Sequence, residues 1–87
     1  MAKLEKTIII KCKQGLHARP AAMFVQIAHK YTANVMIRKG AEQVNGKSIM
    51  GILMLGADHG SEVLMSVDGE DAEKMFAELE AYLVKEE

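Results

Sequence analysis

The order of strand-like and helix-like hydrophobic patterns along the chain constrains its fold more than any other feature. Strands are predicted at residues 7–13, where β-branched residues dominate, and at residues 62–67, where apolar and polar residues alternate. Two more are predicted at residues 35–38 and 42–44, which flank a turn that contains glycine. Helices are predicted from helical apolar spacing, or from a serine and a glycine that bound an apolar segment, at residues 18–31, at 49–55 and after Gly69. In 87 residues, this order predicts a two-layer α+β fold, an antiparallel sheet covered on one face by helices.

The apolar residues of each predicted element fall on one side, which we expect to face the core. On the first and last strands these residues are Ile8, Ile10 and Cys12, and Val63, Met65 and Val67. On the first and last helices they are Ala21, Phe24, Ile27, Ala28 and Tyr31, and Ala72, Met75, Leu79, Tyr82 and Leu83. Polar residues take the opposite strand positions, so the other sheet face is predicted to be solvated: Thr7, Lys11, Glu62 and Ser66.

Composition excludes several classes of function. With 11 Lys+Arg against 12 Asp+Glu and no basic run, the chain lacks the electrostatic attraction on which nucleic-acid binding relies. No apolar run approaches the roughly 18 residues of a membrane span, and the single cysteine forms no internal disulfide. We therefore expect one domain over residues 1–87, cytoplasmic, without membrane insertion or direct nucleic-acid contact. A domain this small works on its surface, which disfavours an independent enzyme.

His17 has the most distinctive setting of the three histidines. It lies in Gly-Leu-His-Ala-Arg-Pro, residues 15–20, directly before the first predicted helix, whose first turn accommodates Pro20. The positive end of that helix favours a nucleophilic ring nitrogen and stabilises a dianion bound to it. Arg19 adds a guanidinium suited to phosphate oxygens. The pattern favours a histidine that accepts a phosphoryl group, and simple helix capping by His17 is the alternative.

The other two histidines carry a weaker signal. His29 falls on the polar side of the first predicted helix and His59 in an Asp-His-Gly loop, so both are predicted to be solvated. The three histidines contain no pair at helical ligand spacing, and we therefore expect no metal site.

Ser48 begins the short predicted helix 49–55 and is predicted to cap it, with Gly56 at the end. A phosphate on Ser48 would be stabilised by the same helix end and would add negative charge beside apolar side chains. The helix contains too many large apolar residues for one buried stripe. Some are expected to form an exposed docking surface, and close packing under a loop is the alternative.

Two motifs resemble those of HPr, the histidine-containing phosphocarrier protein of the bacterial phosphoenolpyruvate-dependent sugar phosphotransferase system. They are Gly-Leu-His-Ala-Arg-Pro-Ala at residues 15–21 and Asn-Gly-Lys-Ser-Ile-Met-Gly at residues 45–51, and the similarity extends over essentially the whole chain. The resemblance implies an open-faced β-sandwich, four antiparallel strands with three helices on one face.

The resemblance also implies a mechanism. His17 would accept a phosphoryl group on Nδ1 from enzyme I, charged by phosphoenolpyruvate, and donate it to enzyme IIA domains. Arg19 and the Ala18 backbone amide would stabilise the phosphoryl group. Ser48 matches the regulatory serine modified by HPr kinase/phosphorylase, after which family members act as corepressors of the catabolite control protein. The chain would be a monomeric, stoichiometric carrier without a cofactor, not an enzyme.

Partners would dock on residues around the two motifs: Leu16, Ala18, Pro20, Ala21, Lys47, Ile49, Met50, Ile52 and Leu53. Gln14 departs from the small hydroxyl or amide residue common in the family, which puts a local hydrogen bond into the active loop in doubt. A specialised paralogue in nitrogen or regulatory signalling fits the same motifs. An interaction module that never carries phosphate remains a further alternative, whereas an RNA-binding domain lacks basic and aromatic residues in the required places.

Overall fold

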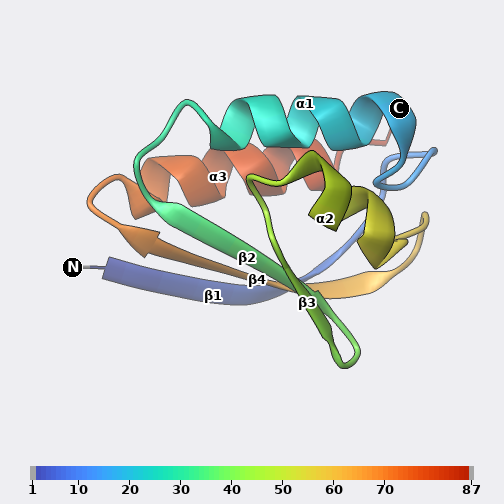
Figure 1. Ribbon diagram of the computed structural model, residues 1–87, viewed down its shortest axis with the longest axis horizontal. Helices are drawn as coiled ribbons and strands as arrows, with labels where there is room; N and C mark the ends of the chain where they lie inside the picture. The colour runs from blue at the N-terminus through green and yellow to red at the C-terminus, as the bar shows by residue number, and fades with distance from the viewer. Residues whose placement is uncertain (1, 87) are drawn as a thin grey trace.

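The computed structural model describes residues 2–86, which form four strands and three helices (Figure 1). The elements are β1 (Ala2–Ile9), α1 (Ala18–Ala28), β2 (Asn34–Lys39), β3 (Glu42–Asn45), α2 (Ile49–Leu55), β4 (Glu62–Gly69) and α3 (Ala72–Leu83). The strands form one antiparallel sheet in the order β1-β4-β2-β3, and the helices lie on one side of it (Figure 1). This confirms the predicted α+β fold and its open-faced β-sandwich architecture.

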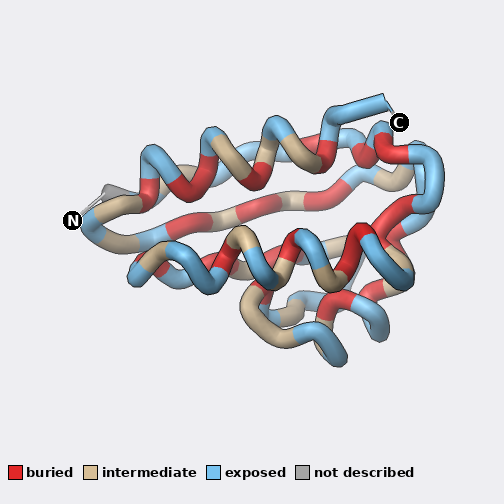
Figure 2. Tube along the Cα trace, turned by 90° about the horizontal axis from the view of Figure 1, so that it is seen from above, coloured by how far each residue is buried: buried red, intermediate tan, exposed pale blue. Residues whose placement is uncertain are grey.

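The core lies between the sheet and the helices. Buried positions alternate along the strands and recur along the helices (Figure 2), as the period of each element requires. Every strand residue predicted to face the core is buried, and the outer positions Thr7, Lys11 and Glu62 are exposed. In the helical stripes, Ile27, Tyr31 and Tyr82 are only partly buried. Phe76 is buried in α3 although the predicted stripe omits it.

The first strand differs from its prediction. It spans Ala2–Ile9 instead of residues 7–13, because β4 supplies hydrogen-bonding partners from Ala2, opposite Gly69, to Ile9, opposite Glu62. Cys12 therefore lies in the following loop, yet it remains buried, and its Sγ donates to the Gly15 carbonyl over 3.5 Å. The burial pattern was visible in the sequence, whereas the strand ends depended on the length of the partner strand.

The first helix ends at Ala28, earlier than the predicted end at residue 31. The chain that follows α1 is bonded to α3 and to the turn that precedes α3. The Thr32 and Ala33 amides donate to the Asp71 carboxylate over 3.0 and 2.9 Å. The Tyr31 hydroxyl donates to Glu78 of α3. These long-range bonds turn the chain out of the helix and toward β2.

The hairpin and the short helix follow their predictions. β2 and β3 pair antiparallel from Met36 opposite Asn45 to Lys39 opposite Glu42. Ser48 caps α2, since its Oγ accepts a hydrogen bond of 3.0 Å from the Gly51 amide. Within residues 2–86, no helix has the length and apolar character needed to cross a membrane.

Candidate functional site

The site is at the start of α1, where His17 is the last residue before the helix. His17 has the extended backbone of an N-cap, φ −125° and ψ 160°, but its side chain makes no capping hydrogen bond. The imidazole Nε2 instead lies 2.6 Å from Oδ1 of Asp58, in the loop between α2 and β4. The ring is therefore oriented by a distant carboxylate, which contradicts the alternative that His17 simply caps α1.

The Asp58 contact distinguishes the two ring nitrogens. An ionised carboxylate only accepts hydrogen bonds, so Nε2 must carry the proton of the shared bond. In the neutral ring, Nδ1 then keeps its lone pair and is the nitrogen able to act as a nucleophile. The His17 side chain is 40% exposed, which leaves the ring accessible to another molecule.

The backbone brings these two segments together. The Leu16 amide donates to the Ala57 carbonyl over 2.7 Å, and the Ser61 amide donates to the Asp58 carbonyl over 2.9 Å. Gly15 packs so closely that a Cβ at its position would lie 2.7 Å from the Ala57 oxygen. Asp58 is 41 residues from His17, and the sequence offered only its place in an Asp-His-Gly loop as a signal.

Ala18, next to His17, adopts a left-handed backbone with φ 48°, unlike any other described residue that is not glycine. This conformation is unfavourable for an L-residue with a Cβ, and such strain concentrates at functional sites. Ala18 and Arg19 begin α1, where the backbone N–H groups have no acceptor within the helix. The positive end of α1 is therefore directed to the segment that carries His17.

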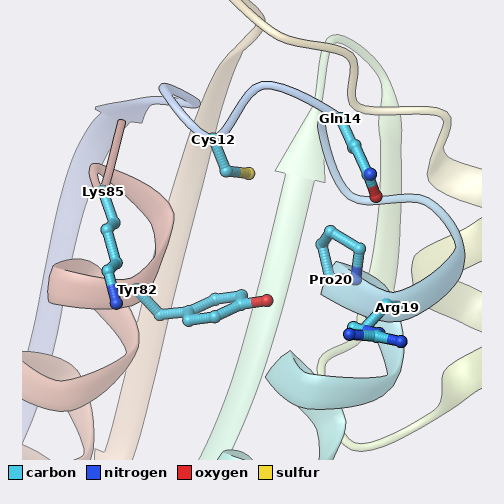
Figure 3. Close-up of a pocket in the computed structure, with 6 residues that line it drawn as sticks. All are labelled: Cys12, Gln14, Arg19, Pro20, Tyr82 and Lys85. Atoms are coloured by element: carbon cyan, nitrogen blue, oxygen red, sulfur yellow. The ribbon is translucent and has the colours of Figure 1, made fainter. Parts of the chain in front are cut away.

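A hollow of about 330 Å³ lies beside this helix start. In Figure 3, the Tyr82 ring extends from α3 toward the start of α1, and Gln14 projects from the loop that precedes α1. Two cationic side chains, Arg19 and Lys85, contribute to its wall. Burial raises the pKa of the Tyr82 phenol above its ordinary value of 10.0. The residues that line the hollow are Cys12, Gln14, Arg19, Pro20, Tyr82 and Lys85.

The hollow adds features that the sequence did not reveal. Tyr82 and Lys85 were not predicted to lie near His17, since they are more than 60 residues later in the chain. Gln14, which departs from the family pattern, faces this hollow (Figure 3). Burial raises the pKa of the Cys12 thiol, in keeping with its predicted structural role.

Ser48 lies at the start of α2, a helix that contacts α1. It is half-buried, and its hydroxyl oxygen is engaged in capping α2. The preceding residue, Lys47, is anchored because its Nζ donates to the Tyr31 carbonyl over 2.8 Å. The Nε2 atom of His29 lies 3.0 Å from the Lys47 carbonyl. His29 is thus exposed as predicted, but it also ties the end of α1 to the loop before Ser48.

The apolar residues of α2 divide between core and surface. Ile49, Met50, Leu53 and Met54, called the α2 patch below, have exposed fractions from 38% to 70%. This confirms that some of the helix is exposed, and it adds Met54, which the predicted docking residues omit. Four predicted docking residues are buried, so their side chains add little to the exposed surface: Leu16, Pro20, Ala21 and Ile52.

The three histidines do not converge. His17 contacts Asp58, and His29 contacts the Lys47 carbonyl. His59 lines a different hollow with Lys11 and Lys13. Among residues 2–86, no group of three histidine, cysteine, aspartate or glutamate side chains is placed to hold a metal ion.

Comparison with known proteins shows the family of this chain. Residues 4–85 match the family model described as the PTS HPr component phosphorylation site. The chain belongs to the HPr family. It is 40% identical over 83 residues to the HPr-like protein Crh of Bacillus subtilis strain 168, an alignment that covers 95% of this chain and 98% of Crh.

Solved structures of HPr proteins share the fold. The phosphocarrier protein HPr of Bacillus anthracis strain Ames superposes with a TM-score of 0.91 at 42% identity, covering 95% of this chain and 99% of that one. Crh of Bacillus subtilis, solved as a domain-swapped dimer, gives a TM-score of 0.77 at 40% identity and covers 95% of each chain. The resemblance inferred from the two motifs is thereby confirmed, and the chain is a member of the phosphocarrier family of the phosphotransferase system.

Proposed function

We propose that this HPr-family protein is a stoichiometric phosphoryl carrier. His17 Nδ1 accepts the phosphoryl group from phospho-enzyme I and passes it to enzyme IIA domains of the sugar system. The observation that carries the proposal is the hydrogen bond between His17 Nε2 and Asp58, because it leaves Nδ1 as the nucleophilic nitrogen on an accessible ring. The family model for the HPr phosphorylation site, matched over residues 4–85, supports the same role.

The surroundings of His17 suit a transferred phosphoryl group. Arg19 lies two residues along the chain, in the first turn of α1, and offers a planar donor for phosphate oxygens. The Ala18 amide and the positive end of α1 favour the same negative charge. The partners supply the remaining catalytic groups, so the carrier needs no cofactor of its own, and it returns to its starting state after each donation.

Docking is assigned to the start of α1 and to α2, two helices that contact each other. The α2 patch offers flexible methionine side chains that adapt to more than one partner, and Ala18 and Arg19 are exposed at the start of α1. Lys47 is half-buried at the edge of this surface. The positive charge of Arg19 at the start of α1 favours brief contacts with acidic partner surfaces. The whole carrier then works as one domain over residues 1–87, in the cytoplasm.

The test is phosphorylation with enzyme I and phosphoenolpyruvate. Wild type is expected to gain acid-labile phosphate, and His17→Ala is expected to gain none. His59→Ala is the matched control, because it removes an exposed histidine that has no part in the site, and it should be phosphorylated like wild type. If wild type takes up no phosphate, the carrier function is wrong. If partners bind His17→Ala as well as wild type while neither is phosphorylated, the interaction module is the better description.

A second phosphorylation, on Ser48, is proposed for regulation by HPr kinase/phosphorylase and ATP. Ser48 starts α2 beside the α2 patch, so a phosphate there would place negative charge against the docking surface. The similarity to Crh, a protein named for catabolite repression, favours a regulatory role with the catabolite control protein. Acid-stable phosphate should appear in wild type and in the control Ser61→Ala, and not in Ser48→Ala.

We propose that the carrier acts as a monomer. All four strands pair within the chain, and β1 is paired with β4 over its entire length. The Crh crystal shows that a relative can exchange parts between two chains. Light scattering on purified protein separates the two states, and a stable dimer at micromolar concentration would show that this chain follows Crh instead.

A further inference from the structure

The contact between His17 and Asp58 joins two loops that the fold holds in place. Asp58 follows Ala57, which is completely buried and accepts the backbone hydrogen bond from Leu16. The Asp58 carbonyl in turn accepts from the Ser61 amide, which closes the loop before β4. Although the Asp58 side chain is 74% exposed, its backbone is therefore fixed relative to His17. An aspartate has only two side-chain torsions, so little freedom is lost when its carboxylate meets the ring.

We propose that Asp58 is a positioning residue for His17: it keeps the proton on Nε2, presents Nδ1 to the phosphoryl donor, and offsets the positive charge that the ring gains on phosphorylation. This inference rests on the proposed carrier function. Neither the periodicity of the sequence nor the two motifs assigned Asp58 a role.

The charge change follows from the transfer itself. The Nδ1 lone pair forms a bond to phosphorus while the bond between phosphorus and the donor atom breaks, and the electron pair of that bond returns to the donor. The Nε2 proton stays on His17 throughout. The ring begins neutral and ends as a cation that carries a phosphoryl group, so the Asp58 carboxylate, 2.6 Å from Nε2, faces a positive partner only after transfer.

Two substitutions separate orientation from charge. Asp58→Asn keeps a side-chain carbonyl that can accept a hydrogen bond from the Nε2–H group, but it removes the negative charge. Asp58→Ala removes both. Asp68→Asn is the matched control, because Asp68 is also exposed and lies at the far end of β4, so it loses the same charge away from His17.

The first readout is the tautomer of His17, measured from the ring nitrogen shifts by ¹⁵N NMR at a pH where the ring is neutral. Wild type, Asp58→Asn and the control are expected to hold the proton on Nε2. Asp58→Ala is expected to show a mixture of both tautomers. A tautomer ratio in Asp58→Ala identical to wild type would overturn the orientation part of the proposal.

The second readout is the equilibrium and initial rate of phosphoryl uptake from phospho-enzyme I. For an exposed charge pair, we expect Asp58→Asn to reduce the equilibrium constant for phosphoryl uptake by about threefold, and Asp58→Ala by about fivefold. If both variants match Asp68→Asn, the charge part is wrong while the carrier function stands. If wild type itself takes up no phosphate, the carrier function fails, and the NMR comparison still decides whether Asp58 orients the ring. Circular dichroism checks that each variant is folded.

Discussion

A methyl group added at Gly15 should disturb both stability and the site, because Gly15 packs against the loop that carries Asp58. Its φ is +68°, and a Cβ there would lie 2.7 Å from the Ala57 oxygen and 2.8 Å from Asp58 Cα. Both neighbours are backbone atoms that cannot rotate away. Gly15→Ala must therefore either shift the loop at residues 57–58 or move the segment that leads to His17.

A control at Gly40 separates the cost of the left-handed backbone from the cost of the steric overlap. Gly40 has φ +61°, but no neighbouring atom lies within 4 Å of the place that a Cβ would take. The left-handed conformation costs an alanine about 1–2 kcal/mol, partly offset by roughly 0.4–1 kcal/mol from its less flexible unfolded chain. Both variants carry this cost. Only in Gly15→Ala does the added methyl group also overlap with backbone atoms. Backbone shifts forced by overpacking typically lower the unfolding free energy by a further amount of about 1–3 kcal/mol.

The assay is thermal unfolding followed by circular dichroism, with wild type, Gly15→Ala and Gly40→Ala compared at one pH. A difference of about 2 kcal/mol between the two variants corresponds to a Tm lower by roughly 8–16 °C in a domain of this size. The His17 tautomer gives a second readout, because a displaced Asp58 loses its hydrogen bond to Nε2. Equal Tm values for both variants would refute the close packing of Gly15 against residues 57–58.

Three further predictions test other parts of the molecule. Ile52→Ala removes a fully buried side chain and should lower the unfolding free energy by about 2–5 kcal/mol, whereas Met54→Ala, on the exposed side of α2, should change it by less than about 0.5 kcal/mol in urea titrations. Ser48→Ala removes the cap of α2 and should cost about 1 kcal/mol in the same titrations, with Ser61→Ala near zero. The hydrogen bond from Lys30 lowers the pKa of Glu78 below its ordinary 4.5, so the contribution of Glu78 to the stability of the fold is present above that pH and is lost as the pH falls. On acidification below pH 4.5, the Tm of Glu78→Gln should therefore decrease less than the Tm of wild type, and parallel curves of Tm against pH would contradict this.

Much of the fold was visible in the sequence because it depends on neighbours along the chain. The cap at Ser48 and the end of α2 at Gly56 are decided within one short segment, and both were predicted. The alternation around Val63, Met65 and Val67 likewise located the buried face of β4. The start of β1 was missed because Ala2–Ile9 takes its length from pairing with β4, not from its own composition.

The docking prediction shows where local pattern fails. Ile52 and Leu53 are adjacent and both apolar, yet Ile52 is buried and Leu53 is exposed. The sequence showed that α2 carries too many apolar side chains for the core, but not which of them would remain outside. That division depends on how the helix is rotated against β3 and α1, which contact it.

The sequence by itself determined the order of the elements, the setting of His17 before a helix and the cap at Ser48, because periodicity and capping act over a few residues. Only the tertiary structure decided that Asp58 meets His17 and that Tyr82 and Lys85 share a hollow with Arg19. Those contacts join residues tens of positions apart, and they exist because the packing of Gly15 and Leu16 against Ala57, and of α3 beside α1, sets the geometry.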